Sequence, residues 1–389
     1  MDRNRQQIWF VLAKLQIGGI ERNSLKLIQQ CLRWGIDVRI ILFERKGELL
    51  EEVPSQVPIT CLGHPFKFAF PYRLAKQIRS QKPACIVSAF DDVNIMVIAA
   101  KALAKSDTPV LLSNHNSFSV AKSESKGLER AKYFLLKYAL PWAFKHAKSI
   151  VAVSNGMTDD LSRSLNIPAH LINVIYNPII DTAFSYRAQL PSVHSVSKQT
   201  ILFVGRLVPQ KNVPNLLNAC AIIKKRQTVD LIIAGDGPLR SQIEDQVTKM
   251  GLADSVRTVG TVINPLPLMA ASGVLVLPSK FEGLGNALVE ALACGTQVVS
   301  TDCPHGPAEI LKNGKYGQLV PVDDPEALAN AIERALSRKF RVEPNILRQR
   351  AAEFSVEKAT RRYLESAGYD ISTLPSPEQA DPQTHPAGD

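Results

Sequence analysis

Short apolar segments alternate with longer amphipathic segments along almost the whole chain, and this alternation restricts the fold more than any other feature. The apolar segments have the length and composition of buried strands, and the amphipathic segments repeat with the period of a helix. Strands and helices that alternate in this way form parallel sheets in doubly wound α/β domains. The predicted strands are residues 8–13, 37–43, 84–89, 109–113, 149–153, 171–176, 200–204, 231–234, 256–260, 274–277, 297–300 and 317–320.

The alternation breaks once, between Pro178 and Lys198, where Pro, Ser, Gln and Ala predominate. A chain of 389 residues is long for one core and suits two domains, each of about 150–200 residues. We therefore predict a Rossmann-like domain over residues 1–180, a linker, and a second Rossmann-like domain over residues 199–350. A last amphipathic helix is expected at about 356–370, and residues 371–389 have the polar composition of a disordered tail.

The composition is typical of a soluble globular protein, with 45% hydrophobic and 21% charged residues. No apolar run approaches the ~18 residues needed to span a bilayer. The apolar segment 8–13 is too short for a secretion signal, so we interpret it as the first strand. The six cysteines show no metal-ligand spacing, and we interpret them as reduced residues of a cytoplasmic protein.

The net charge of +10 comes entirely from the first half of the chain. Residues 1–180 contain 24 Lys and Arg against 14 Asp and Glu, whereas residues 181–389 contain 22 of each kind. Within the first half, the segment 122–148 interleaves seven basic residues with aromatic residues. A basic, aromatic-rich helix can lie on an anionic membrane surface. It can equally pack its apolar stripe on the sheet, and Pro141 can kink or divide it.

Between these alternatives we favour peripheral contact with the inner face of the cell membrane, because the local charge agrees with the wider asymmetry. A nucleic-acid partner is not expected, since no recognised nucleic-acid-binding motif accompanies the basic residues.

The segment Pro278–Pro304 carries the strongest chemical signal. The predicted strand 274–277 enters a loop that contains Gly283 and Gly285, after which Asn286 can cap a helix. A helix start offers unpaired backbone N–H groups and the positive end of the helix dipole, and together these suit a phosphate.

Two carboxylates flank this predicted phosphate position. Glu282 lies in the loop, and Glu290 follows eight positions later, about one turn inside the helix. A carboxylate can accept two hydrogen bonds from neighbouring hydroxyl groups. The arrangement therefore suits a ligand with sugar hydroxyls on either side of a phosphate, which is a nucleotide sugar.

Two further clusters follow predicted strands of the first half. Gly18 and Gly19 separate the first strand from the first helix, where they allow the backbone to approach a phosphate or simply form a turn. His115 follows the strand 109–113, and ligands of parallel sheets bind beyond the carboxyl ends of strands. A solvated or loop-capping histidine is the alternative interpretation.

In the second half, the strand 200–204 runs into Gly205, Arg206 and, further along the same turn, Lys211. Two cations on opposite sides of a diphosphate can neutralise the charge of a departing leaving group, although both can also be solvated turn residues. The segment Gly235–Pro238 resembles a dinucleotide-binding loop but lacks the third glycine.

In this order and spacing the motifs resemble the two-domain GT-B glycosyltransferases, specifically the retaining enzymes of family 4 (glycosyl transferases group 1). The resemblance extends to about residue 370. The motifs that carry it are Gly18-Gly19, His115, Val151–Ser154, Val174–Pro178, Gly205-Arg206-Leu207 with Lys211, Ala234–Pro238, Val276–Ser279 and the Glu282/Glu290 pair.

The resemblance implies a role for each motif. Arg206 and Lys211 would hold the donor diphosphate, Glu290 the ribose hydroxyls, and Glu282 with the 283–285 backbone the transferred sugar. The implied catalytic residues are His115, Arg206, Lys211 and Glu282. The implied donor-binding residues are Gly18, Gly19, Gly205, Arg206, Lys211, Glu282, Gly283, Leu284, Gly285, Asn286, Leu288 and Glu290.

The resemblance also implies two domains that face each other across a cleft. The first would bind the acceptor, bring Gly18-Gly19 to the phosphate and place His115 near C6 of the sugar, and the last helix would cross back to it. No cofactor is expected. No catalytic metal is expected either, because the chain has no Asp-x-Asp motif and the Arg206/Lys211 pair can supply the positive charge.

Retention of configuration can follow two routes. A double displacement needs a carboxylate nucleophile ~3 Å from the anomeric carbon, and Glu282 is the obvious candidate. Glu282 is better suited to hold sugar hydroxyls. We therefore favour same-face attack, in which the departing phosphate takes the acceptor's proton.

The segment Asp302–Glu309 resembles members that use UDP-hexose or UDP-N-acetylhexosamine to build bacterial surface polysaccharides, such as lipopolysaccharide, or lipid-linked oligosaccharides. The expected partners are thus a nucleotide sugar and a glycan or lipid-linked acceptor. The segment Leu284–Asn286 departs from the family, because many relatives have Phe-Pro or Phe-Gly after the first glycine. We expect Leu284 to alter contacts near the sugar.

Three other classes remain open. A nucleotide-sugar epimerase of the same fold and a catalytically inactive UDP-sugar-binding protein would share these motifs. A dehydrogenase is disfavoured because no Gly-x-Gly-x-x-Gly follows the first strand.

Overall fold

The computed structural model describes residues 7–63, 69–115, 117–124, 127–372 and 374. The chain divides into two compact units, the first formed by residues 1–178 and 356–389 and the second by residues 179–355. Each unit contains one parallel sheet, so the expected α/β fold with two Rossmann-like units is confirmed. Most of the tail that was predicted to be disordered, from residue 375 onward, lies outside the described residues.

The first unit is built on a seven-stranded sheet in the order β3-β2-β1-β4-β5-β6-β7, and all neighbouring strands are parallel. Its strands are β1 (Ile8–Leu12), β2 (Val38–Leu42), β3 (Ile59–Cys61), β4 (Cys85–Ser88), β5 (Val110–Asn114), β6 (Ser149–Ala152) and β7 (Ile172–Val174). The strands β1, β4, β5 and β6 are buried along their whole length, as expected for a sheet with helices on both faces.

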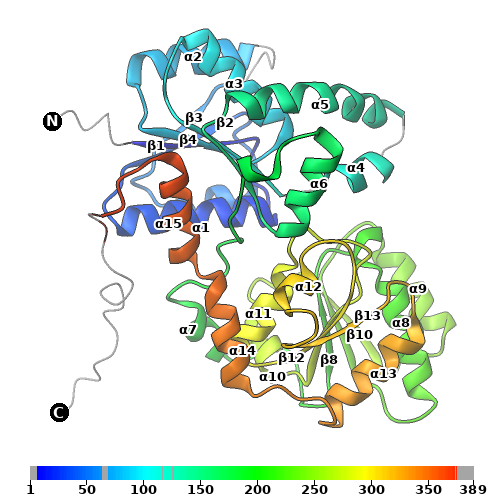
Figure 1. The fold of residues 1–389 in the computed structure, drawn as a ribbon. Coiled ribbons are helices and arrows are strands. Elements are labelled where there is room, and N and C mark those ends of the chain that lie inside the picture. Colours follow the sequence, from blue (N-terminus) through cyan, green and yellow to red (C-terminus); the bar gives the residue numbers. More distant parts are fainter. Residues whose placement is uncertain (1–6, 64–68, 116, 125–126, 373, 375–389) are drawn as a thin grey trace, which may run out of the picture. The chain divides into compact units, whose positions relative to one another are not determined.

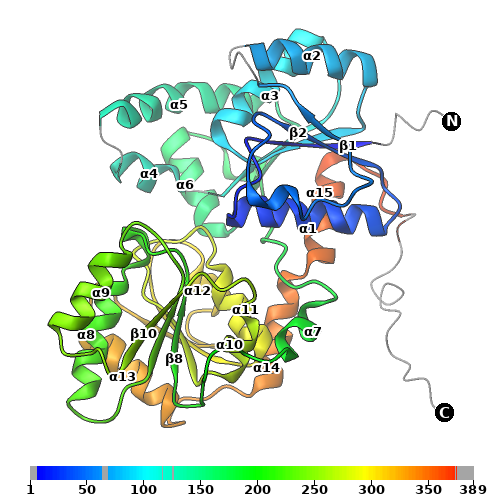
Figure 2. The ribbon, with the colours of Figure 1, turned by 180° about the vertical axis from the view of Figure 1, so that it is seen from behind.

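Helices cover both faces of this sheet. Figures 1 and 2 show α2, α3 and α5 on one face and α1 and α15 on the other. The helices of the first unit are α1 (Gly19–Arg33), α2 (Phe70–Gln81), α3 (Asp91–Ala104), α4 (Phe118–Glu124), α5 (Gly127–His146), α6 (Asn155–Leu165) and α15 (Val356–Ala367). The last helix, α15, thus completes the core of the unit in which the chain begins, where Tyr363 and Leu364 pack with residues of β1 and α1.

The second unit is built on a six-stranded parallel sheet in the order β10-β9-β8-β11-β12-β13. Its strands are β8 (Ile201–Val204), β9 (Leu231–Ala234), β10 (Val256–Gly260), β11 (Val274–Leu277), β12 (Gln297–Thr301) and β13 (Gln318–Val320). Figures 1 and 2 show α8, α9 and α13 on one face and α10, α11 and α14 on the other. The helices are α7 (Phe184–Gln189), α8 (Val213–Lys224), α9 (Arg240–Lys249), α10 (Leu266–Ala271), α11 (Asn286–Cys294), α12 (Pro307–Ile310), α13 (Pro325–Leu336) and α14 (Pro344–Ala351).

The segment between Pro178 and Lys198, predicted as a linker, is a structured part of the second unit. It contains α7, which packs against α10, and the side-chain amide of Asn264 donates a hydrogen bond to the Arg187 carbonyl. Ile180 forms a parallel bridge with Ser355, so the two ends of this unit lie side by side. A polar composition concealed this short helix, because only Phe184 in it is buried.

Other elements also differ from the sequence prediction, which did not include α14. The strand β3 was missed because its three residues are all only partly buried and form no apolar run. The basic segment 122–148 was expected to be kinked or divided at Pro141, and α5 is not divided there, since it runs from Gly127 to His146 through this proline. Among the described residues, no helix has the length and apolar character required to cross a bilayer.

Candidate active site

The second sheet has a topological switch point between β8 and β11. From β8 the chain proceeds outward to β9 and β10, whereas from β11 it proceeds in the opposite direction to β12 and β13. The chain therefore leaves these two neighbouring strands toward opposite edges of the sheet, and open α/β sheets bind ligands beyond the carboxyl ends of the strands at such a point. The loop after β8 contains Gly205–Lys211, and the loop after β11 contains Pro278–Gly285.

A short ion pair joins these two loops. The Lys211 Nζ atom lies 2.6 Å from Glu282 Oε1, and the side chains are 19% and 6% exposed. The Ser279 hydroxyl donates a hydrogen bond of 2.6 Å to the same carboxylate oxygen. Removing one partner of such a buried pair leaves a buried charge without compensation, which typically costs about 3–5 kcal/mol. The fold therefore holds a carboxylate and an ammonium group together at the switch point.

Backbone contacts hold the same loops in register. The Lys280 N–H donates to the Gln210 carbonyl at 2.8 Å, and the Gln210 side-chain amide donates back to the Phe281 carbonyl at 2.9 Å. A reciprocal pair of this kind fixes the spacing between the loops. It consequently fixes the positions of Lys211 and Glu282, which are the neighbours of Gln210 and Phe281.

Two glycines permit the close backbone approach in this region. A Cβ atom at Gly235 would lie 1.8 Å from the Gly205 carbonyl oxygen, and one at Gly306 would lie 1.8 Å from the Leu284 carbonyl oxygen. The Gly235–Pro238 motif, which resembles a dinucleotide-binding loop, therefore has a packing role beside the loop after β8. Gly306 likewise supports the loop after β11 from the segment Asp302–Glu309.

The helix α11 begins at Asn286, and its N-cap is Gly285, with φ of +100° and no side-chain cap. The prediction that Asn286 caps this helix is therefore wrong, because the left-handed backbone at Gly285 makes Asn286 the first helical residue. Glu290 is half-buried in the second turn of the helix. The start of α11 thus directly follows the loop that carries Glu282 and Gly283, and the phosphate site expected there stays a prediction.

The two leucines among the predicted donor-binding residues face the core. Leu284 is 2% exposed and Leu288 is fully buried. The buried position of Leu284 does not support the expectation that its side chain alters contacts near a bound sugar, because a ligand could reach only its backbone.

Arg206 is the exposed cation of the loop after β8. Across the part of the chain that the structure describes, its guanidinium forms no hydrogen bond or ion pair. Lys211, by contrast, is held by Glu282. The two predicted diphosphate-binding cations thus differ, because one is fixed by the fold and the other is solvated.

The first sheet has its own switch point, between β1 and β4. Gly18 and Gly19 follow β1, and Gly19 is the first residue of α1. A Cβ atom at Gly18 would lie 2.4 Å from the Glu21 Oε2 atom, so the missing side chain at Gly18 makes room for this carboxylate. Gly18 has extended backbone dihedral angles. Its conformation is therefore open to any residue, and a side chain there would displace only the flexible end of the Glu21 side chain.

His115 belongs to a hydrogen-bonded chain of side chains. Its Nε2 atom lies 2.9 Å from the Ser113 hydroxyl, which in turn lies 2.8 Å from the Tyr363 hydroxyl on α15. Burial lowers the pKa of His115 to about 4, although a hydrogen bond with the Asn177 side chain acts in the opposite direction. His115 is therefore neutral at physiological pH. Neither alternative drawn from the sequence, a solvated or a loop-capping histidine, describes it.

A second titratable group lies at the carboxyl end of β4. The side-chain amide of Asn114 donates a hydrogen bond of 3.0 Å to Asp91 Oδ1. Burial, with a smaller contribution from Asp92, raises the pKa of Asp91 to about 6. Sequence reasoning missed Asp91, Ser113 and Tyr363. The first two could have been found because they lie at the ends of predicted strands, whereas nothing in the sequence relates Tyr363 to His115.

The described residues contain no group of three or more His, Cys, Asp or Glu side chains that could hold a metal ion. At the second switch point the fold brings together the ammonium group of Lys211 and the carboxylate of Glu282.

Comparison with known proteins identifies the family. A model described as "Glycosyltransferase Family 4" matches residues 17–183, and one described as "Glycosyl transferases group 1" matches residues 198–338. One relative is the GalNAc-α-(1→4)-GalNAc-α-(1→3)-diNAcBac-PP-undecaprenol α-1,4-N-acetyl-D-galactosaminyltransferase of Campylobacter jejuni. It is 30% identical over 374 residues, which cover 92% of this chain and 97% of the relative. The chain belongs to the family-4 glycosyltransferases.

Solved structures place this family-4 glycosyltransferase in the GT-B fold. The apo form of the lipopolysaccharide outer core galactosyltransferase WaaB has a TM-score of 0.72 at 19% identity and covers 92% of this chain and 98% of its own. The structure of Anabaena HepE in complex with UDP has a TM-score of 0.74 at 20% identity, and the match covers 93% of this chain and 99% of HepE. The recognition made from the motifs is therefore confirmed, and so is the GT-B fold.

Proposed function

We propose that the protein is a retaining glycosyltransferase that transfers a hexose or an N-acetylhexosamine from a UDP-sugar to a glycan or lipid-linked acceptor. The observation that carries the proposal is the Lys211–Glu282 pair at the switch point of the second sheet. Two relatives support the choice of substrates, since the Campylobacter enzyme is named for an undecaprenol-linked acceptor and HepE was solved with UDP.

In this proposal the loops of the second sheet bind the donor. Lys211 directs two N–H groups to the diphosphate while the third is held by Glu282, and Arg206 closes over the diphosphate from solvent. The other oxygen of Glu282 and the 283–285 backbone bind hydroxyls of the transferred sugar. Glu290 binds the ribose hydroxyls, and the first turn of α11 approaches the phosphates.

The chemical step is a same-face substitution. The bond between the anomeric carbon and the UDP oxygen breaks while the acceptor oxygen forms a new bond to that carbon from the same side. The acceptor's hydroxyl proton passes to the departing phosphate oxygen, and UDP leaves. Arg206 and Lys211 stabilise the charge that grows on the diphosphate, which is work otherwise given to a metal ion.

The first unit supplies His115, Gly18 and Gly19 in this proposal. A neutral imidazole suits a hydroxyl ligand, because it can donate one hydrogen bond without attracting the phosphates away from the second unit. We assign His115 to the transferred sugar near C6. Gly18 and Gly19 offer backbone N–H groups at the start of α1 to the phosphate, in competition with the Glu21 carboxylate.

Contact with an anionic membrane through α5 also belongs to this proposal. One side of α5 packs inward through residues such as Leu136, Leu140 and Phe144, which are buried. The other side exposes large apolar groups and basic residues. The exposed apolar side chains are Phe134 (59%), Leu135 (68%), Tyr138 (65%) and Trp142 (41%). The exposed basic residues are Arg130, Lys132, Lys137 and Lys145. Aromatic rings between cations suit the interface of an anionic bilayer.

Vesicle flotation tests this surface. We expect the protein to float with vesicles of phosphatidylglycerol and phosphatidylethanolamine but not with phosphatidylcholine alone, and expect the double substitution Phe134→Ser with Trp142→Ser to abolish flotation. The matched control is Tyr72→Ser, which removes an exposed ring (70%) from α2. Equal flotation of the double variant would remove α5 from the proposal.

Donor choice is tested by a thermal-shift panel of UDP-, GDP- and ADP-sugars, followed by transfer assays with the best binder. We expect UDP-sugars to raise the melting temperature most, because ligand binding to the folded state stabilises it. A preference for GDP- or ADP-sugars contradicts the donor assignment. Conversion of a UDP-sugar without acceptor would identify an epimerase instead, and binding without any turnover an inactive UDP-sugar-binding protein.

A further inference from the structure

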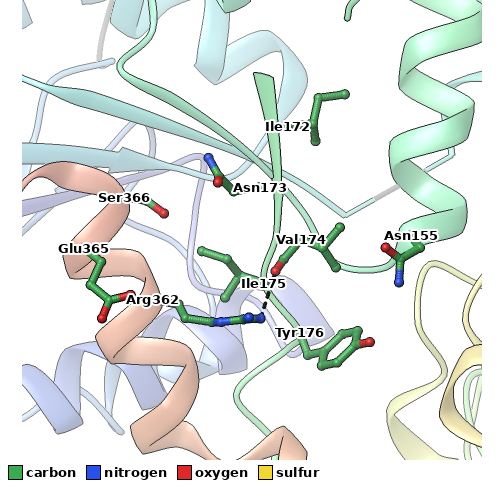
Figure 3. Close-up of a pocket in the computed structure, with 9 residues that line it drawn as sticks. All are labelled: Asn155, Ile172, Asn173, Val174, Ile175, Tyr176, Arg362, Glu365 and Ser366. Atoms are coloured by element: carbon green, nitrogen blue, oxygen red, sulfur yellow. Dashed lines mark hydrogen bonds between the residues drawn. The ribbon is translucent and has the colours of Figure 1, made fainter. Parts of the chain in front are cut away.

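The first unit contains a polar pocket of about 530 Å³ at its edge strand β7. Figure 3 shows this strand between α15 on one side and the start of α6, with Asn155, on the other. The volume lies in the range of about 300–1,000 Å³ that is usual for small-molecule sites. None of the roles proposed above uses this pocket, whose lining residues are mostly polar.

One wall of the pocket is a face of α15. Arg362, Glu365 and Ser366 are three and four positions apart, so they lie on the same side of the helix and line the pocket together. Arg362 Nη1 donates a hydrogen bond of 3.2 Å to the Val174 carbonyl oxygen of β7, as drawn in Figure 3. This bond fixes the guanidinium group and leaves its other N–H groups to donate elsewhere.

The other side of the pocket carries amide groups and an aromatic ring. Asn173 of β7 and Asn155 of α6 line it, and Tyr176 follows two residues after the strand. The Asn173 amide nitrogen donates to the Ser149 hydroxyl at 2.8 Å, which fixes the orientation of this side chain. Figure 3 shows these groups arranged around the strand rather than stacked on one another.

The lining chemistry excludes several classes of ligand. The charges of Arg362 and Glu365 cancel, so the pocket favours neither a phosphate nor a cation. Amide, hydroxyl and charged groups dominate over apolar ones, so a lipid chain does not suit it. Addition of a further strand to β7 is blocked, because Arg362 already occupies the outward carbonyl oxygen of Val174.

A neutral ligand with many hydroxyl groups fits what remains. Carboxylate, guanidinium and amide groups each bind two neighbouring hydroxyls, and the Tyr176 ring offers a flat apolar surface to the C–H face of a sugar. We propose that this pocket binds a glycan, namely sugar residues of the acceptor that are remote from the reacting hydroxyl. The inference rests on the proposed function, since it assumes a glycan-bearing acceptor.

Such a subsite changes how acceptor length affects the reaction. Binding energy from a remote part of a substrate improves kcat/KM for long acceptors without changing the handling of the donor. The enzyme then measures glycan length, because an acceptor too short to reach the pocket gains nothing from it. Variants of the pocket consequently affect long acceptors alone.

The first arm of the test measures binding without catalysis. Titration calorimetry uses the full-length protein without donor and two probes, the α-1,4-linked N-acetylgalactosamine trisaccharide and maltotriose. We expect millimolar or tighter binding of at least one probe. We expect Ser366→Trp, which fills the pocket, and Glu365→Ala to weaken it about tenfold or more. The matched control is Glu51→Ala, an exposed glutamate of the same unit, and it should bind as the wild type does.

The second arm measures transfer to acceptors of one and of several sugar residues. We expect Ser366→Trp to raise KM for the long acceptor about tenfold and to leave the donor KM and the short-acceptor kcat unchanged. Circular dichroism confirms that the variant is folded, and Glu365→Ala repeats the test without added bulk.

The outcomes separate this inference from the function on which it rests. Failure of both probes to bind the wild type, or equal binding by Ser366→Trp, overturns the subsite while sugar transfer can still stand. Probe binding that the pocket variants weaken, in a protein that transfers no sugar, retains the glycan site and overturns the proposed transferase.

Discussion

The two units share one architecture and differ in the chemistry at their switch points. The second sheet places an ion pair between neighbouring loops, with Lys211 Nζ 2.6 Å from Glu282 Oε1. The first sheet instead has two carboxylates after its switch-point strands, Glu21 after β1 and Asp91 after β4, and a histidine after the next strand, β5, where burial holds the pKa of His115 near 4. Equivalent topologies therefore hold different groups, and in our proposal the ion pair of the second unit binds a diphosphate while the neutral imidazole of the first binds a hydroxyl. Strand order decides where a site lies, and a few side chains decide what it binds.

The largest effect is expected at the charged site. Replacing Lys211 by Met removes a cation from the proposed diphosphate site and leaves Glu282 buried without its partner. We expect kcat/KM to fall about 10²–10³-fold, as when one preorganised transition-state donor is removed. The control is Lys280→Met, a neighbouring lysine whose pairing with Asp323 is long, at 3.9 Å. Equal losses in both variants would show that this loop has no specific catalytic role.

Arg206 tests the second cation of the charged site, which is solvated, whereas Lys211 is held by the fold. We expect Arg206→Ala to weaken UDP binding about tenfold, through the loss of charge-assisted hydrogen bonds worth about 1.5–3 kcal/mol each. Uridine, which has no phosphate, should bind almost as before. Titration calorimetry with the two ligands measures this difference, and parallel losses for both would place Arg206 at the nucleoside instead.

Acid should destabilise the neutral site. The folded-state pKa of His115 lies below its ordinary value of 6.5. The unfolded chain therefore binds this proton first, and stability is lost as the pH falls from about 6.5 towards 4. Allowing for the partial exposure of the ring, we expect about 1–2 kcal/mol of acid-dependent loss that His115→Gln removes. Urea unfolding at pH 7 and pH 4.5 measures it, with exposed His170→Gln as the control. An unchanged pH dependence in His115→Gln would indicate that this imidazole is not kept neutral by the fold.

The smallest effect is expected at Tyr363, which positions His115 through Ser113. Burial raises the pKa of Tyr363 to about 12, so its hydroxyl stays protonated and can donate to Ser113. Ser113 can then donate to Nε2, which leaves the ring proton on Nδ1. We expect Tyr363→Phe to lower kcat several-fold, the equivalent of about 1 kcal/mol.

The tautomer of His115 tests this positioning role directly, because a residue that only stabilises the fold would not change which ring nitrogen is protonated. Nitrogen NMR of histidine-labelled protein should report an Nδ1-protonated His115 in the wild type and a mixture of tautomers in Ser113→Ala. The same tautomer in both proteins contradicts the positioning role. Exposed Ser80→Ala, on α2, is the matched control.

Long periodic segments made the fold predictable, while short or half-buried ones did not. The strand β1 was foreseen because all five of its residues are apolar and buried, whereas β3 has no buried residue to produce a pattern. The prediction that Asn286 caps α11 failed because the positive φ of Gly285 moves the cap by one residue. Capping preferences do not encode such a local dihedral angle.

The candidate site was likewise predictable in part: the positions of its residues could be predicted, but their tertiary contacts could not. The neighbours Lys211 and Glu282 were placed correctly in their loops, because both follow strands that a switch point brings together. Their direct ion pair is a tertiary contact between residues 71 positions apart, and no local pattern reports it. The link from Tyr363 to Ser113 spans 250 positions, so the sequence offered still less. Burial, which sets the pKa of His115, is likewise a property of the assembled fold.

The most direct test of the account follows the transfer reaction by proton NMR. The wild type and Lys211→Met are each supplied with an α-linked UDP-sugar and a glycan acceptor. The account predicts one UDP released for each sugar transferred, an α-linked product from the wild type, and a rate lower by about 10²-fold in the variant. A β-linked product would contradict the same-face mechanism, and undiminished transfer by Lys211→Met would contradict the placement of the donor site at the second switch point.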